Sequence, residues 1–149
     1  MDHFSEAELV KAYTTIVRPI AEYCAPVFHS MLTDWQDELL ERLQATALRF
    51  IFGYGIPYSE MRERAGIDTL RQRRILLCDK FARKCLTSER FASWFPKTTQ
   101  GRRSRHTLEY REDFARCDRL KNSPLYYVRR RLNGKEGKTY GERNRRYRE

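Results

Sequence analysis

The chain lacks the features that mark several classes of protein. It has no run approaching the ~20 apolar residues that a membrane span needs, and no apolar segment follows its acidic start, Asp2-His3-Phe4-Ser5-Glu6. Its four cysteines contain no close pair. Because zinc ligands usually come in short couples of cysteine or histidine, neither a zinc site nor a disulfide framework is expected. These absences predict an intracellular protein of the nucleus or cytoplasm, soluble and without a cofactor.

Catalytic motifs are lacking as well. The sequence contains no glycine-rich phosphate loop and no pair of adjacent aspartates. Two-metal polymerase chemistry needs clustered aspartates that hold Mg²⁺, and nucleophilic catalysis needs a serine or cysteine beside a histidine, for which no local motif is present. We therefore expect the chain to be catalytically inert by itself.

Charge, in contrast, is plentiful and unevenly divided. Residues 1–95 carry 13 basic and 13 acidic side chains, whereas residues 96–149 carry 17 basic and 7 acidic ones, so the net charge of +10 lies in the last third. Arginine runs in that third are interleaved with tyrosines. Guanidinium groups bind phosphates and aromatic rings stack on unpaired bases, so the pattern favours RNA or DNA as the partner. The alternative is a basic tail that only keeps the protein soluble.

The candidate binding residues all belong to this basic third. Contacts to phosphate are expected to dominate, with tyrosines as possible stacking platforms, which predicts binding that tolerates many sequences. The candidate phosphate ligands are Arg102, Arg103, Arg105, Arg129, Arg130, Arg131, Arg143, Arg145 and Arg146, and the candidate platforms are Tyr126, Tyr127 and Tyr140.

Residues 1–95 are predicted to form an all-α helical bundle, because their apolar residues recur at helical spacing. Ser5 and Glu8 form a capping-box signal for a long first helix, in which Pro19 predicts a kink or a restart. The expected apolar stripe of that helix is Leu9, Tyr13, Ile16, Ile20, Tyr23 and Val27.

Two further long helices and one short helix are expected in the same region. Thr33 with Gln36 caps a helix that ends at Gly53, and its expected broad apolar face is Trp35, Leu39, Leu40, Leu43, Ala47, Phe50 and Ile51. A short helix from Tyr58 to Ala65 ends at Gly66. Asp68 or Thr69 caps the last, with an inward stripe of Leu70, Leu77, Cys78, Phe81, Ala82 and Cys85.

Arg74 interrupts the inward stripe of this last helix. A buried unpaired charge would cost several kcal/mol, so Arg74 is expected to bond a carboxylate or main-chain carbonyls. Arg73, Lys80 and Lys84 fall on a flanking stripe, which is either a solvated face or a track for backbone phosphates. Three cysteines, Cys24, Cys78 and Cys85, are expected to be buried as small hydrophobic residues.

The last third divides into a basic linker at 96–122, a short helix at 123–134 and a disordered basic tail at 135–149. Asn122-Ser123-Pro124 is a helix-start signal and Gly134 a stop. Leu125, Val128 and Leu132 share a face that can pack on the bundle. Tyr127, Arg130 and Arg131 are then expected to point outward.

Five sequence blocks follow one another along the chain: LVKAYTTIVRPIAEYCAPVFHS, LERLQATALRFIFG, DTLRQRRILLCDKFARKCL, WFP and NSPLYYVRRRLN. Their order resembles the C-terminal, thumb and post-thumb region of non-LTR (LINE-type, jockey-like) retrotransposon reverse transcriptases. The resemblance covers Leu9 to Asn133 and implies a role in holding template and primer near an active site that lies elsewhere. The catalytic aspartate motif, the endonuclease domain and the Cys/His knuckle of such proteins are missing from this sequence.

Two functions therefore follow from the sequence. The first is a non-catalytic nucleic-acid-binding fragment of an RNA-directed DNA polymerase, whose partners are nucleic acid and the palm or fingers of a parent polymerase. The second is a helical protein-interaction module whose aromatic edge, Trp94 and Phe95, docks on another protein, with the tail for solubility only. A large exposed apolar patch on the bundle would favour the second.

Overall fold

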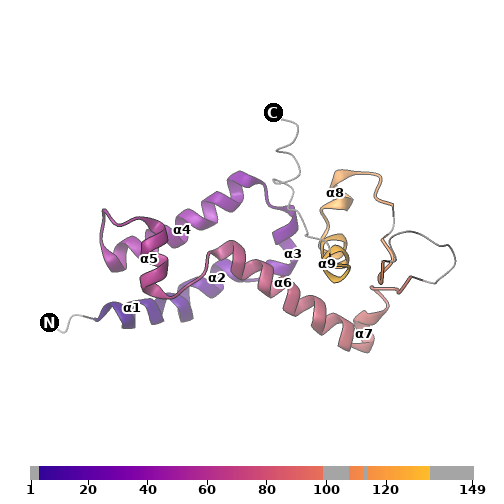
Figure 1. The fold of residues 1–149 in the computed structure, drawn as a ribbon, viewed down its shortest axis with the longest axis horizontal. Helices are drawn as coiled ribbons and strands as arrows, with labels where there is room; N and C mark the ends of the chain where they lie inside the picture. Colours follow the sequence, from indigo (N-terminus) through magenta and orange to yellow (C-terminus); the bar gives the residue numbers. More distant parts are fainter. Residues whose placement is uncertain (1–3, 99–107, 113, 135–149) are drawn as a thin grey trace.

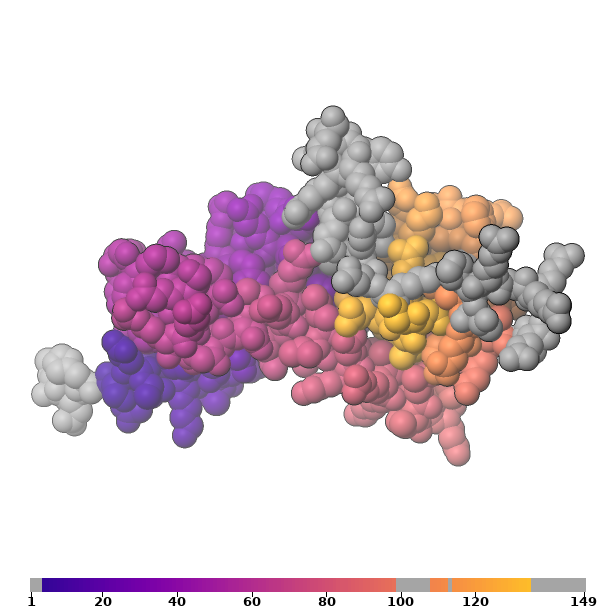
Figure 2. Space-filling view, viewed as in Figure 1, coloured from indigo at the N-terminus to yellow at the C-terminus, as the bar shows by residue number. Residues whose placement is uncertain are grey.

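A computed structural model describes residues 4–98, 108–112 and 114–134 of the chain. This part is all-α, with an isolated antiparallel bridge between Lys97 and Tyr110 and no strand among the described residues. The body is elongated, and the elements near the N-terminus lie at the opposite end from the elements after residue 88 (Figures 1 and 2). No helix in the described ranges is both long and apolar enough to cross a membrane.

The first helical segment consists of α1 (Glu6–Ala12), a π-helical turn (Tyr13–Val17) and α2 (Arg18–Glu22). The Ser5–Glu8 capping box is present, as predicted. Pro19 has no N–H to donate, and it lies in the first turn of α2, so the helix restarts there as predicted. A second break follows at Cys24, whose φ of 56° is left-handed.

Cys24 is exposed at this break, so the prediction that it is buried is wrong. It caps α3 (Ala25–Phe28), which continues into a 3-10 turn (His29–Met31). Because the chain changes direction here, the apolar stripe of the first segment does not follow one continuous buried face. Its members Ile16, Ile20, Tyr23 and Val27 are all exposed.

The next three helices begin as predicted, and the first two of them also end as predicted. They are α4 (Asp34–Phe52), α5 (Tyr58–Ala65) and α6 (Leu70–Thr87). Capping boxes from Thr33 and Thr69 start α4 and α6, and Gly53 and Gly66 end α4 and α5 with positive φ. Figure 1 shows α6 running lengthwise, from the α4–α5 end of the molecule toward α7.

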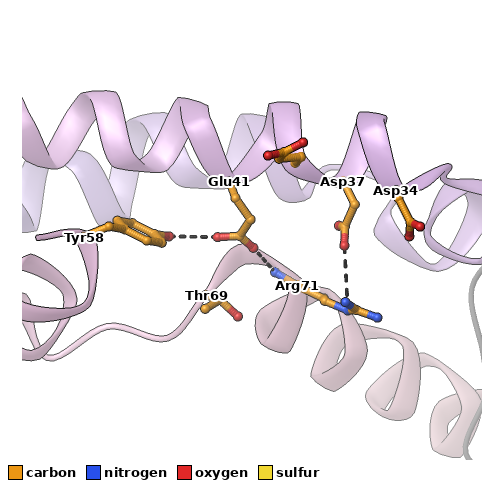
Figure 3. Close-up of a pocket in the computed structure, with 7 residues that line it drawn as sticks. Asp34, Asp37, Glu41, Tyr58, Thr69 and Arg71 are labelled. Carbon is orange, nitrogen blue, oxygen red and sulfur yellow. Dashed lines mark hydrogen bonds and ion pairs between the residues drawn. The ribbon is translucent and has the colours of Figure 1, made fainter. Parts of the chain in front are cut away.

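The orientation of α4 differs from the prediction. Its buried residues are Gln44, Ala45 and Leu48, whereas Trp35, Leu39, Leu43 and Phe50 of the expected inward face are exposed. The reason is that the side of α4 that faces α5 and α6 carries polar side chains, and these form hydrogen bonds and ion pairs there. These are Asp37, Glu41 and Gln44, two of which Figure 3 shows pointing toward α6.

Gln44 and Glu41 connect four elements through one hydrogen-bonded network. Tyr13 Oη donates to Gln44 at 2.9 Å, and Gln44 Nε2 donates to Tyr58 Oη at 2.9 Å and to the Asp68 carbonyl at 3.0 Å. Tyr58 Oη donates to Glu41 at 2.8 Å, and Glu41 also accepts the Arg71 backbone N–H at 2.8 Å. Burial raises the pKa of Tyr13 to about 12, so its hydroxyl stays a donor. The network satisfies the polar groups that α4 turns inward.

Arg74 is completely buried on α6 and donates to Asp37 of α4, which confirms the prediction made for it. Burial lowers its pKa, while Asp37 favours the charged form. The neighbouring Arg73 also forms an ion pair, so it belongs to neither a solvated face nor a phosphate track. Its guanidinium bonds Glu22 of α2 with two contacts of 3.0 and 3.1 Å. Glu22 pairs in addition with Arg18 at 3.5 Å, four residues earlier.

The C-terminal elements are α7 (Glu89–Ala92), α8 (Asp118–Lys121) and α9 (Pro124–Leu132). As predicted, Val128 of α9 packs into the core, and Leu125 and Leu132 pack against it. The core cluster joins α6, α9 and the segments beside them: Cys78, Ala82, Cys85, Phe95, Tyr110, Tyr127 and Val128.

Part of the segment expected to be a basic linker contributes to this core. Tyr110 is buried, its N–H donates to the Asn133 side chain at 2.9 Å, and its carbonyl accepts from that side chain at 3.0 Å. Ser30 also donates to the carbonyl of buried Asn122 at 2.7 Å. Residues 108–112 and 114–122 thus fold back on the bundle. The tail expected to be disordered, 135–149, lies outside the described residues.

Arg74→Ala is expected to lower the free energy of unfolding by about 3 kcal/mol, because it leaves a cavity and removes the closest partner of Asp37. Arg73→Ala should cost about 1 kcal/mol, since Arg18 still accompanies Glu22. The exposed Arg42→Ala serves as the control, with a change near zero. Urea unfolding followed by circular dichroism measures all three, and equal values for Arg74→Ala and Arg42→Ala would contradict the assigned role of Arg74.

Candidate nucleic-acid interface

Helix α9 carries five of the candidate binding residues, and it turns two of them inward. Tyr127 is 3 % exposed and meets the buried His29 ring edge-on, with 5.2 Å between ring centroids. Tyr126 is also buried, with the Arg129 guanidinium 6.0 Å from its ring. The prediction that Tyr127 points outward is wrong, because its side chain packs in the core cluster with residues of α6. Neither ring offers a free face for stacking on a base.

Two of the three α9 arginines are held by the fold. Arg131 bonds Asp79 of α6 with Nε to Oδ1 at 2.9 Å and Nη2 to Oδ2 at 2.6 Å, and this pairing raises the pKa of Arg131. Arg129 donates to the Trp94 carbonyl at 2.8 Å through Nη2. Bidentate charged pairs are stronger than neutral hydrogen bonds. Arg131 therefore holds α9 against α6, and the prediction that it points outward is wrong.

Arg130 is the α9 arginine that stays available. It is partly exposed and makes no ion pair within the residues that the structure describes. The other candidate ligands, together with Tyr140, lie outside the described residues. These ligands are Arg102, Arg103, Arg105, Arg143, Arg145 and Arg146.

Helix α6 carries an exposed basic face. Lys80, Arg83 and Lys84 are exposed at spacings of three and four, which places them on one face of the helix. That face lies opposite Cys78, Ala82 and Cys85, which pack in the core cluster with α9. None of the three basic residues forms an ion pair with another described residue. Arg83 was missed from the sequence, although its spacing from Lys80 was a usable signal.

The pocket between α4, α5 and α6 has the opposite character. It is an open pocket of about 470 Å³ lined by acidic and polar residues (Figure 3): Asp34, Asp37, Glu38, Glu41, Tyr58, Thr69 and Arg71. Its carboxylates would repel phosphate. Over the described ranges, no group of three histidine, cysteine, aspartate or glutamate side chains is arranged to hold a metal ion.

The aromatic edge proposed for protein docking is also only partly available. Phe95 is buried in the core cluster, whereas Trp94 is about half exposed and packs edge-on against Phe91. Apolar exposure is instead concentrated on the first helical segment and on α4. No protein-family model, curated protein or solved structure matches the chain, so the resemblance of its sequence blocks to reverse transcriptases stays a hypothesis.

Arg131→Ala should lower the free energy of unfolding by about 1–2 kcal/mol, because a partly buried Asp79 loses both of its charged hydrogen bonds. Arg130→Ala removes the same charge from the same helix and should leave stability unchanged within about 0.5 kcal/mol. Denaturant titration of the two variants makes the comparison. A larger loss for Arg130→Ala would mean that the roles of these neighbours are reversed.

Proposed function

We propose that this chain is a non-catalytic, nucleic-acid-binding part of a retrotransposon-type RNA-directed DNA polymerase, where it helps to hold template and primer. The observation that carries the proposal is the exposed basic face of α6, where Lys80, Arg83 and Lys84 form no ion pair with another described residue. The ordered sequence blocks support it, as does the concentration of net positive charge in residues 96–149. Ion pairs hold Arg131 of α9 and the arginines in the first turns of α6, and Arg129 bonds the Trp94 carbonyl.

Contacts to phosphate dominate in this function. The buried rings of Tyr126 and Tyr127 leave the described part of the surface without a stacking platform at α9. Point charges on long side chains neutralise phosphates without reading bases, so binding tolerates many sequences and depends steeply on salt. The arginines at 102, 103, 105, 143, 145 and 146 extend the same charge along the chain.

A second candidate function is a protein-interaction module. The observation that favours it is the number of large apolar side chains that stay in contact with water. In a folded protein, grouped exposed apolar residues mark interaction surfaces more often than isolated ones do. The most exposed of them on the helices before residue 53 are Ile16, Ile20, Tyr23, Val27, Trp35 and Phe50.

The nucleic-acid proposal is tested by salt-dependent binding of the full chain to a labelled duplex and a labelled single strand. With six to ten phosphate contacts, affinity for the duplex should fall roughly 10³ to 10⁵ fold between about 50 and 200 mM salt. Replacing Lys80, Arg83 and Lys84 together with Ala should flatten the slope of log K against log salt by up to about three units. Removing residues 135–149 should flatten it further without touching the described core.

The matched control removes three exposed cations from the other end of the molecule. Lys11, Arg42 and Arg64 changed together to Ala alter the net charge equally and should leave the slope nearly unchanged. Truncation at residue 97 is unsuitable, because it removes Tyr110, Tyr127 and Val128 from the core. Binding that is equally weakened by both triple variants would indicate a general charge effect, and no binding at low salt would contradict the proposal.

The purified chain is expected to extend no primer, because nothing in it supplies the clustered aspartates that hold catalytic metal. Burial also raises the pKa of the Cys78 thiol to about 12, which keeps that side chain from acting as a nucleophile. Primer extension with Mg²⁺ or Mn²⁺ is the measurement. Incorporation above that of a mock purification would overturn the expectation.

A further inference from the structure

Helix α4 presents an apolar stripe to solvent along its whole length. Trp35, Leu39, Leu43 and Phe50 are 65 %, 41 %, 46 % and 74 % exposed. At 3.6 residues per turn, the four lie within an arc of about 80°. Thr46 falls in the same arc, and its hydroxyl donates to the Arg42 carbonyl of its own helix at 2.8 Å. The stripe therefore has no unsatisfied polar group.

The exposure of this stripe does not result from poor packing of α4. The opposite side of α4 is already occupied by α5 and α6, with Gln44 and Leu48 fully buried and Asp37 paired with Arg74. Turning the helix to bury the stripe would break those bonds and leave the buried Arg74 guanidinium without its carboxylate, which is strongly destabilising. In Figure 1, α4 lies along the upper edge of its half of the molecule. No other described residue of the chain covers the stripe.

We propose that a second copy of this chain covers it, through antiparallel packing of α4 on α4. About a point between Arg42 and Leu43, the two aromatic ends of the stripe exchange places, Leu43 comes next to its own copy and Leu39 lies opposite Thr46. A two-fold axis through that point sets Trp35 against the partner's Phe50 and brings Leu43 of both copies together. The same patch is then used twice, as a closed two-fold interface requires.

Charge complementarity fixes the direction. One flank of the stripe carries Glu38, Arg42 and Arg49, and the two-fold axis brings this flank against itself in reverse order. Glu38 then lies within one helical turn of the partner's Arg49, twice over. Parallel packing would set this flank against the opposite flank of the partner, without the Glu38–Arg49 pairs, and would align the two helix dipoles unfavourably.

Interface size indicates how tight the dimer is. One pair of helices contributes less surface than the usual stable complex, so the dimer is a reversible one that forms at micromolar or higher concentration. The inference gives the protein-interaction function a definite partner. It does not depend on nucleic-acid binding, and it is tested without nucleic acid.

Sedimentation equilibrium of the full chain, from about 5 to 500 µM in moderate salt, is expected to show a monomer–dimer equilibrium. Leu43→Lys should weaken dimerisation at least tenfold, because it places a charge in the middle of the stripe. Phe114→Lys changes a similarly apolar, 87 % exposed side chain elsewhere and should have no effect. A chain that stays monomeric at 500 µM, or a dimer indifferent to Leu43→Lys, overturns the proposal.

Charge reversal tests the antiparallel arrangement. Glu38→Arg and Arg49→Glu should each weaken the dimer several-fold, since each sets like charges opposite one another. The double variant Glu38→Arg with Arg49→Glu exchanges the charges and should restore most of the affinity. All sites are exposed, so circular dichroism should show an unchanged fold. Single variants that weaken the dimer without rescue by the double variant contradict the antiparallel interface.

Discussion

The buried ion pair between Arg74 of α6 and Asp37 of α4 is the constraint on which the arrangement of the bundle depends. A guanidinium with no exposure to water needs a carboxylate beside it, and α4 supplies one. Once Asp37 faces α6, helical geometry brings Glu41 and Gln44 to the same side, where Tyr58, the Arg71 backbone and Tyr13 complete their bonds. The same rotation turns Trp35 and Phe50 to solvent.

Two surfaces of different character follow from this arrangement. On α4, an apolar stripe is covered by no other described residue. On α6, Lys80, Arg83 and Lys84 form no ion pair with another described residue. Helix α6 also holds the fold together, since its first turns bind α4 and its Asp79 pairs with Arg131 of α9. The two proposals assign association to the stripe on α4 and phosphate contact to the basic face of α6.

Local signals in the sequence predicted the helices closely. Three capping boxes, at Ser5, Thr33 and Thr69, start helices where they were expected, and Gly53 and Gly66 end them. Such signals depend on a few neighbouring residues, so tertiary packing of the helix does not change them. The burial and pairing of Arg74 were also predicted, because a charged side chain within an apolar stripe needs a polar partner. The burial of Tyr110 and Tyr127 was not, since their partners lie more than 20 residues away.

The sequence by itself determined the helical class, most helix ends, the burial of Arg74 and the uneven distribution of charge. Only the tertiary structure decided which face of each helix is buried. An apolar stripe on a helix indicates that this face is favourably buried, but it does not indicate whether it packs against this chain or against another molecule. On α4, the residues that bond Arg74, Tyr58 and Tyr13 face inward while four apolar side chains stay exposed, and on α9 two tyrosines expected to meet bases are buried instead. A buried charge without its partner is strongly destabilising, and whether the partner is present depends on both helices.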